Sequence, residues 1–264
     1  MIRLVTSNVQ HAAVGGEHVD LERLAHALAG LDGDVVALQE VDRGQDRSGG
    51  ADQARVLAGA LGMTEHRFVP TLRGQTDDWL RRRRARGDEP AATPGYGIAL
   101  MTRLPVRRWH QVRLPAFALP GAPPPGVDEP RAALAAVVET PDGPLTVVTT
   151  HLTKLRALKW YQLAALRRRL RGAPRPLVVL GDLNQRDDVP AHRTGWTELV
   201  RVPTYPAERP RLRLDHVLTD GPVEAVGTAR AVDLGVSDHR AVVVDVGLTA
   251  GTPRAGAPSA RAGR

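Results

Sequence analysis

The stretch LVVLGDLN, residues 177–184, decides the fold more than any other part of the sequence. Leu177–Leu180 are apolar without alternation, which is typical of a strand that is buried on both faces. Asp182 and Asn184 follow this apolar run directly. Open sheets place their sites at strand ends. The stretch therefore predicts a central strand that leads into a functional site.

Isolated polar residues follow or precede other apolar stretches in the same way. Taken singly each is weak evidence, because an Asn after a strand is usually a turn residue and a lone His is more often structural than catalytic. Their repetition at strand ends is hard to explain by turns alone, so we expect the side chains to converge. The set comprises Asn8, Glu40, His151, Asp182, Asn184, Asp215, Asp238 and His239.

The apolar patterns predict paired strands separated by helices and loops, which argues for two stacked sheets flanked by helices. The strands are expected at Ile2–Val9, Val35–Leu38, Gly97–Met101, Ala133–Glu139, Leu145–Thr150, Leu177–Leu180, Leu214–Leu218 and Ala241–Val246. The helices are expected at Leu21–Leu31, Gln53–Leu61 and Lys154–Arg171. Pro115–Pro130 is predicted to be a loop that borders a substrate cleft. We expect one catalytic domain over residues 1–248 and a disordered tail over 249–264.

Composition excludes several classes of protein. The 264 residues are 42% hydrophobic and 25% charged, as in ordinary globular domains. The absence of cysteine excludes disulfides, thiolate zinc sites and a cysteine nucleophile. The net charge of +7 indicates either an anionic partner or a base-composition bias toward arginine. Arg81–Arg84 with Arg86 is either a phosphate-attracting loop or, the favoured interpretation, a solvated helix face or mobile insertion.

The chain start, MIRLVTSNVQHA, becomes polar too soon for a signal peptide, and no apolar run approaches the ~20 residues of a membrane helix. We therefore expect a soluble, cytoplasmic protein with no transmembrane segment. The sequence does not give the oligomeric state, and a monomer is the default.

Carboxylate and carboxamide oxygens without thiolates suit a hard cation, Mg²⁺ or Mn²⁺, that also contacts substrate phosphate. Glu40 is the best single ligand candidate. Histidines supply a general acid or base and a positive charge for the phosphorus centre. His151 and His239 fit these roles.

Seven segments in order along the chain resemble the successive motifs of the endonuclease/exonuclease/phosphatase superfamily. They are SNVQH (7–11), ALQEVDR (37–43), YGIALMTR (96–103), TTHL (149–152), GDLN (181–184), RLDHV (213–217) and SDH (237–239). The resemblance spans residues 7 to 239, and it implies a four-layer αββα sandwich with two mixed sheets and a site in the cleft at one sheet edge. In particular, it resembles compact bacterial hydrolases of unassigned substrate.

The resemblance also implies roles for the polar residues. Asn8, Glu40 and Asp238 would surround the divalent ion. Asp182 would orient or deprotonate the attacking water, and Asn184 would hold phosphate or nucleophile in line.

The histidines would bind the phosphate from two sides. His239 would hydrogen-bond a phosphate oxygen or act as acid or base, with Asp215 fixing its tautomer. His151 would bind phosphate from the other side. No covalent enzyme intermediate is needed.

Three further residues are candidates for substrate contact. Arg131, in EPRAAL, resembles an arginine that precedes a strand in many relatives, where it could contact phosphate in a bidentate manner. Arg43 and Tyr96 could also touch substrate, although a surface ion pair and a packed turn aromatic explain them equally well. His11 and His216 are interpreted as packing or turn residues.

These observations predict a metal-dependent phosphoester hydrolase, with a phosphodiesterase favoured and nucleic acid preferred over phospholipid or inositol phosphate as substrate. One alternative is a phosphatase acting on a small phosphorylated metabolite or lipid headgroup. The remote alternative is a non-catalytic module that binds nucleic acid or lipid. Aromatic residues make up only 3% of the chain, so platforms for base stacking are few.

Overall fold

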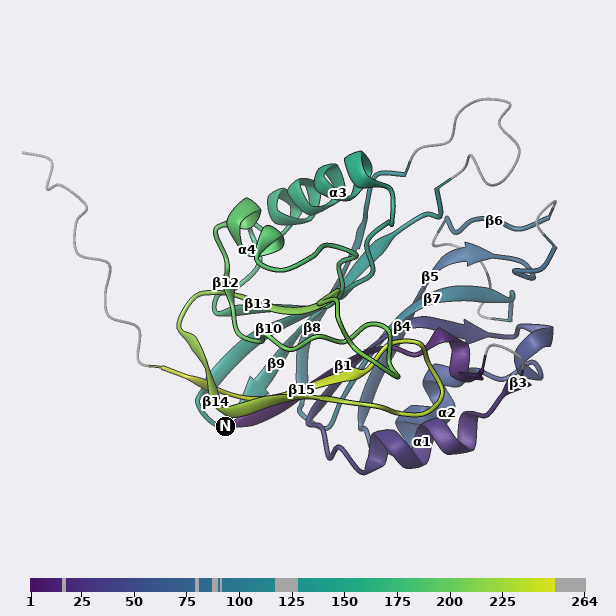
Figure 1. The fold of residues 1–264 in the computed structure, drawn as a ribbon, viewed down its shortest axis with the longest axis horizontal. Coiled ribbons are helices and arrows are strands. Elements are labelled where there is room, and N and C mark those ends of the chain that lie inside the picture. Colours follow the sequence, from purple (N-terminus) through teal and green to yellow (C-terminus); the bar gives the residue numbers. More distant parts are fainter. Residues whose placement is uncertain (16–17, 79–80, 87–89, 91, 117–127, 250–264) are drawn as a thin grey trace, which may run out of the picture.

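The computed structural model describes residues 1–264 except 16–17, 79–80, 87–89, 91, 117–127 and 250–264. Two large mixed sheets stack face to face, and helices cover their outer faces (Figure 1). The four-layer αββα sandwich is therefore confirmed. The expected tail lies outside the described residues except for Thr249, and so does most of the expected loop at Pro115–Pro130.

The first sheet has seven strands, with β1 and β4 parallel at its centre. Its order is β14 (Val223–Val232), β15 (Ala241–Leu248), β1 (Ile2–Asn8), β4 (Val35–Arg43), β7 (Gly95–Thr102), β5 (Glu65–Arg73) and β6 (Arg83–Arg84). The helices α1 (Leu21–Ala29) and α2 (Gln53–Ala60) cover its outer face. A small ribbon, β2 (Ala13–Val14) with β3 (His18–Val19), and two 3₁₀ turns, Gln10–Ala12 and Asp46–Ser48, complete this half.

The second sheet has six strands, with β10 and β11 parallel. Its order is β12 (Thr197–Glu198), β13 (Asp215–Asp220), β11 (Leu177–Asp182), β10 (Gly143–Thr150), β9 (Ala132–Thr140) and β8 (Val106–Arg113). The helices α3 (Arg156–Arg169) and α4 (Val189–Thr194) lie over its outer face (Figure 1).

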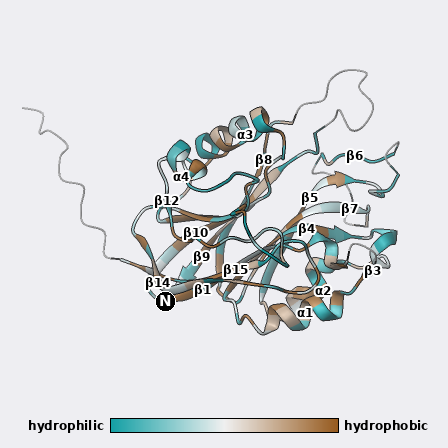
Figure 2. Ribbon diagram, in the orientation of Figure 1, coloured by the Kyte–Doolittle hydropathy of each residue, from teal (hydrophilic) through white to brown (hydrophobic). Residues whose placement is uncertain are grey.

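The core explains why the central strands are apolar throughout. Val178 and Leu180 of β11 point into the layer between the sheets, whereas Leu177 and Val179 pack under α3. Successive side chains of a strand point to opposite faces, so both sets are buried. Figure 2 shows the hydrophobic colouring concentrated along the central strands and the inner faces of the helices.

Several expectations about local structure were wrong. Strand β4 does not end at Leu38 but continues to Arg43, and β5, β8 and β14 were not predicted at all. The arginine run is not a helix face, because Arg83 and Arg84 form the short exposed strand β6 against β5.

Within the described part of the chain, no helix is both long and apolar enough to cross a bilayer.

Candidate active site

The polar residues predicted at strand ends come from both sheets and meet at one edge of the sandwich. β1 and β4 are parallel, as are β10 and β11, so residues at the carboxyl ends of these strands lie at the same edge. β13 runs antiparallel to β11, with Asp215 opposite Asp182, so the start of β13 reaches the same place. The strand topology therefore explains how residues far apart in the sequence form one site.

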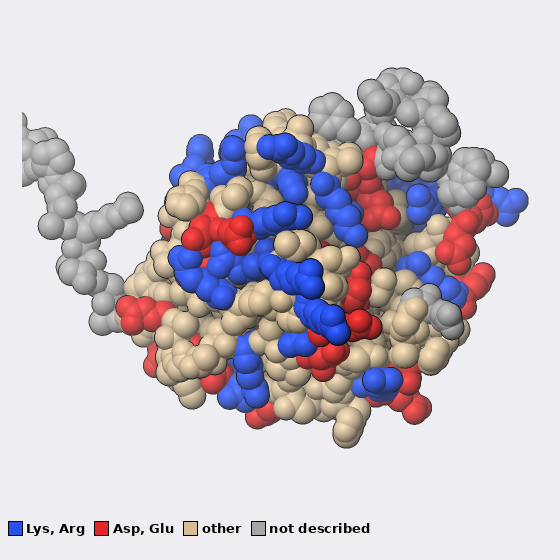
Figure 3. All heavy atoms as spheres, in the orientation of Figure 1, with Lys and Arg blue, Asp and Glu red and all other residues tan. Residues whose placement is uncertain are grey.

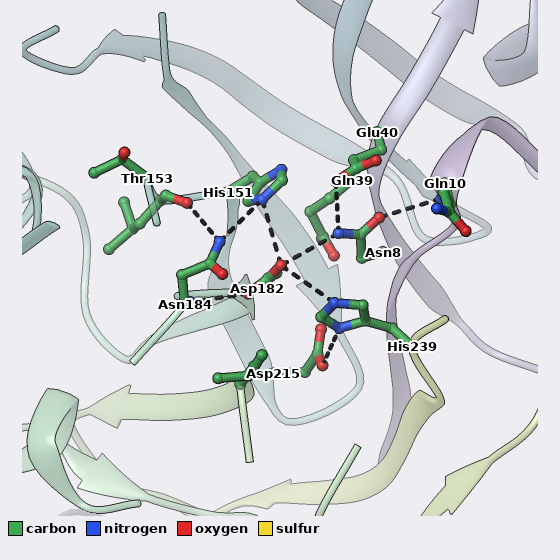
Figure 4. Close-up of polar contacts among 12 residues, drawn as sticks. Asn8, Gln10, Gln39, Glu40, His151, Thr153, Asp182, Asn184, Asp215 and His239 are labelled. Carbon is green, nitrogen blue, oxygen red and sulfur yellow. Dashed lines mark hydrogen bonds and ion pairs between the residues drawn. The ribbon is translucent and has the colours of Figure 1, made fainter. Parts of the chain in front are cut away.

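Asp182 lies at the centre of this group (Figure 4). Its Oδ2 accepts a hydrogen bond from Asn8 Nδ2 at 3.2 Å and lies 3.3 Å from His151 Nε2 and 3.8 Å from His239 Nε2. Its Oδ1 accepts from the backbone N–H of Asn184 at 2.8 Å. The carboxylate is fully buried. Its position and orientation are therefore fixed from several sides.

The electrostatics keep Asp182 ionised. Burial alone raises the pKa of a carboxyl group, but the charge and hydrogen bond of His151, together with the charge of His239, hold the pKa of Asp182 well below its ordinary value. A buried carboxylate with this low a pKa is a weak base in the resting site.

His239 is held from behind by a second buried carboxylate. Its Nδ1 donates to Asp215 Oδ2 at 2.9 Å, and Thr204 Oγ1 donates to the same oxygen at 2.5 Å. Burial lowers the pKa of an imidazole, but the charge and hydrogen bond of Asp215, aided by the charges of Asp182 and Asp238, raise the pKa of His239 to about 9. At neutral pH the ring is therefore a cation.

His151 and Asn184 form the opposite wall. Asn184 Nδ2 donates to the carbonyl oxygen of Leu152 at 2.8 Å and lies 3.2 Å from His151 Nε2. Both side chains are buried. Asn184 has a positive φ of 51°, a conformation that asparagine tolerates better than most residues. The turn after β11 thus directs the amide of Asn184 toward His151.

Glu40 reaches the site through a β-bulge. The register between β4 and β7 shifts between Gln39 and Val41, and Glu40 has a φ of 60°. A bulge re-aims one side chain without ending the strand. Glu40 Oε1 accepts from Asn8 Nδ2 at 2.9 Å. Burial raises the pKa of Glu40, but the charge of His151 and the bond from Asn8 lower it below its ordinary value.

The donor atoms around Asn8 fit a hard divalent cation. The single amide nitrogen of Asn8 bridges two carboxylates, Glu40 and Asp182, whose charges repel each other. No hydrogen bond to the second oxygen of Glu40 occurs within the described residues. Mg²⁺ uses one or two carboxylates and otherwise keeps its waters, so Glu40 beside the amide of Asn8 fits such an ion. The assignment of Asn8 and Glu40 to a metal stays a prediction.

Asp238 does not join this group. Its side chain is exposed on the wall of a neighbouring cavity of about 510 Å³, and within the described residues only its backbone oxygen is hydrogen-bonded, to Ala207 N at 2.8 Å. Within the described ranges, no three His, Asp or Glu side chains form a compact metal-ligand cluster. The assignment of Asp238 to the metal stays a prediction, with the structure placing it beside the site.

The three predicted substrate contacts lie in different places. Arg131 is buried, pairs with Glu129 at 3.2 Å and lowers the pKa of Glu40 by its charge. Tyr96 is also buried beside these groups, and burial and the charge of Glu40 raise its pKa. Arg43 instead lies 4.8 Å over the ring of Phe68, and no contact joins it to the site in the described part of the chain. All three assignments stay predictions.

The two histidines interpreted as packing or turn residues make no hydrogen bond to the site residues in the described part of the chain, although the charge of Glu40 acts on His11. His216 is enclosed between Glu198 and the backbone oxygen of Gln185, at 2.7 and 2.8 Å. His11 lies in the 3₁₀ turn after β1 with a φ of 48°.

Sequence analysis missed two residues that contact the site. Ser237 Oγ donates to the backbone oxygen of Asn8 at 2.6 Å and accepts from His239 N at 3.1 Å, so it ties the start of β15 to the end of β1. Lys159 Nζ on α3 donates to the backbone oxygen of Asn184 at 2.5 Å. The serine could have been found from its place in SDH, but a lysine on a helix gives no such signal.

A model of the endonuclease/exonuclease/phosphatase family matches residues 5–239, almost the whole described chain. The protein belongs to this family. No curated protein matches the sequence. Members of the family generally hydrolyse phosphoesters and generally depend on divalent metals.

Solved structures confirm the fold at low sequence identity. An endonuclease/exonuclease/phosphatase from Beutenbergia cavernae is 24% identical with a TM-score of 0.71, covering 94% of this chain and 71% of that one. The human Nocturnin catalytic domain with bound sulfate is 20% identical with a TM-score of 0.62, covering 94% of each chain. TDP2 from D. rerio, complexed with a single-strand DNA product, is 17% identical with a TM-score of 0.61, covering 93% of this chain and 98% of that one.

Proposed function

We propose that the protein is a divalent-metal-dependent phosphodiesterase whose substrate is a nucleic acid. The observation that carries the proposal is the position of Asp182 between His151 and His239, at 3.3 and 3.8 Å. An ionised carboxylate flanked by imidazoles is suited to the attack of water on a phosphate that these rings hold. The net charge of +7 and a relative that holds single-strand DNA support nucleic acid over lipid.

In this reaction water attacks phosphorus and the ester P–O bond breaks. Asp182 orients the water and takes its proton, and Asn184 holds the nucleophile or a phosphate oxygen in line. The cationic His239 donates an N–H to a phosphate oxygen and supplies positive charge where negative charge develops. Glu40 and Asn8 would hold Mg²⁺ or Mn²⁺, which polarises the phosphorus and neutralises the departing oxygen when bound.

The test measures hydrolysis of bis-p-nitrophenyl phosphate and p-nitrophenyl phosphate with Mg²⁺ or Mn²⁺, with EDTA as the metal-free control. We expect metal-dependent turnover of the diester that falls at least about a thousandfold in Asp182→Asn, the scale on which loss of a group central to the chemistry acts. Asp187→Asn is the matched control, because this exposed aspartate lies in the same loop and has no contact with the site within the described residues.

The alternatives give different results. Turnover of the monoester alone would replace the diesterase with a phosphatase. Metal-independent binding of DNA or lipid without turnover of either ester would support a non-catalytic module. Equal turnover by Asp182→Asn and the parent protein would overturn the mechanism.

A further inference from the structure

A group of cations on α3, on α4 and in the loop before α4 adjoins the site without being part of it. Lys159 on α3 contacts the backbone of Asn184 at 2.5 Å, so the helix touches the catalytic turn directly. Burial lowers the pKa of Lys159, and the charges of Arg186 and Arg156 lower it further. Lys159 is therefore within electrostatic range of both arginines as well as of Asp182.

An aromatic side chain lies between two of these cations. Trp160 is partly exposed on α3, with the guanidinium of Arg193 3.9 Å from its ring centroid and that of Arg156 5.9 Å away. Arg193 comes from α4, so the contact joins the two helices. Tyr161, the next residue, is 56% exposed. Trp160 therefore lies between two arginine guanidiniums, and Tyr161 adds an exposed ring next to it in the sequence.

These cations are not neutralised by the protein. Over the described ranges, no ion pair joins Arg156, Lys159, Arg186 or Arg193 to a carboxylate. The nearby Asp188 is occupied by Arg201 and Arg213, at 2.6 and 2.7 Å. Figure 3 shows Lys and Arg side chains gathered over the part of the molecule where Figure 1 places α3 and α4. Unpaired cations that repel one another at close range favour an anionic ligand.

We propose that this surface, Arg156, Lys159, Trp160, Arg186 and Arg193, binds a single nucleic-acid strand on one side of the phosphodiester that is cleaved. The cations contact successive phosphates, Trp160 holds the guanidiniums of Arg156 and Arg193 beside its ring, and the exposed Tyr161 offers a face on which a base stacks. Cations and stacking aromatics are the combination by which proteins bind single strands. The link through Lys159 and Asn184 sets the strand in register with Asp182. The placement of the cleaved bond rests on the proposed function, but the binding itself does not.

A lipid surface fits this face less well. Membrane-bound helices present a continuous apolar face. On α3 the exposed positions that follow Tyr161 are Ala164, Arg167, Arg168 and Arg169, which carry no bulky apolar side chain. Leu155 and Val189 are exposed at the starts of α3 and α4, but they are single residues and form no continuous apolar face. A single strand, with its phosphates and bases, matches a surface of cations and aromatic rings better than a bilayer does.

The test measures binding of fluorescein-labelled (dT)12 by anisotropy, in EDTA so that no metal-dependent cleavage occurs. The double variant Arg156→Gln/Arg193→Gln is expected to bind at least about tenfold more weakly than the parent protein. The slope of log K against log salt should also fall by about 1.4, because each phosphate contact on a single strand contributes about 0.7.

The matched control is Arg55→Gln/Arg108→Gln, which removes the same charge from exposed positions on α2 and β8. It should change the affinity less than about twofold. A loss of affinity equal to that of the test pair would mean that net charge alone governs binding, and it would overturn the proposal. Tyr161→Leu should weaken binding without changing the salt slope, because a stacking contact releases no counterions.

Two further measurements separate this inference from the proposed function and from lipid binding. If bis-p-nitrophenyl phosphate is hydrolysed but the double variant binds (dT)12 as tightly as the parent protein, the proposed binding surface is wrong and the proposed hydrolase activity is supported. If no ester is hydrolysed but binding of (dT)12 depends on the two arginines, the proposed binding surface is supported and the proposed hydrolase activity is contradicted. Arginine-dependent binding to phosphatidylglycerol vesicles in place of (dT)12 would overturn the inference.

Discussion

Asp182 and Asp215 face each other across the β11–β13 ladder and hold opposite nitrogens of one imidazole. His239 Nδ1 lies 2.9 Å from Asp215, and its Nε2 lies 3.8 Å from Asp182. Both carboxylates are fully buried. A histidine between two buried anions keeps its proton, which supports the proposed roles of His239 as a cation and of Asp182 as the proton acceptor.

The first prediction concerns pH. If His239 acts as a cation, activity is lost as the ring deprotonates, so kcat/KM on the diester should fall as pH rises through about 9. Asp215→Asn removes the charge that raises the pKa of His239, and the alkaline loss of activity should then move to lower pH, toward the ordinary value of 6.5. Rate profiles between pH 5 and 10 for both proteins measure the shift.

The same pKa shift affects stability with a defined sign. The folded-state pKa of His239 lies above its ordinary value of 6.5, so its contribution to stability is fully present below pH 6.5 and is lost as pH rises toward about 9.

The rate profiles also test the assignment to His239. An alkaline loss of activity that stays at the same pH in Asp215→Asn would mean that a group other than His239 causes it. Asp220→Asn, at the far end of the same strand, is the control.

The second prediction concerns the metal. Glu40→Gln keeps the shape of the side chain but removes its charge, so the apparent affinity for Mg²⁺ or Mn²⁺ should fall by at least about tenfold, the lower end of the effect seen at metal sites. Turnover at saturating metal should recover in part. Thermal denaturation with and without Mn²⁺ gives a second readout, because a ligand that binds only the folded state raises its stability.

Glu224→Gln is the control for this change, since Glu224 is exposed on the edge strand β14. It should leave the Mn²⁺-dependent rise in melting temperature unchanged. An unaltered rise in Glu40→Gln would remove Glu40 from the metal site.

The sequence predicted the buried strands well and the exposed ones poorly, for a physical reason. β11 is buried on both faces and is therefore apolar at every position before Gly181, whereas β14 exposes most of its residues at the sheet edge and carries no such pattern. β8 is an edge strand as well, with Arg108 and His110 exposed. Many side chains of an edge strand face solvent and do not pack in the core, so the strand does not carry a continuous apolar pattern.

The site residues could be predicted by identity but not by backbone geometry. Glu40 was expected at the end of a strand, but it occupies a bulge within β4, and a bulge depends on the register with β7 that a single sequence does not contain. Lys159 was missed because a lysine on an amphipathic helix usually faces solvent. Only the tertiary packing of α3 against the turn after β11 brings it to Asn184.

The last prediction concerns the glycine before Asp182. Gly181 has a φ of 142°, and a Cβ there would lie 2.0 Å from the backbone oxygen of Thr150, which the parallel partner strand cannot move. Gly181→Ala should therefore lower the free energy of unfolding by more than about 2 kcal/mol, as expected where alanine is incompatible with the native φ. Gly59→Ala is the matched control, because Gly59 lies in α2 with nothing near its added Cβ. That change should raise stability by roughly 0.5–1 kcal/mol through helix propensity. Urea unfolding of both variants measures the two effects, and a neutral Gly181→Ala would show that the end of β11 before Asp182 does not require glycine.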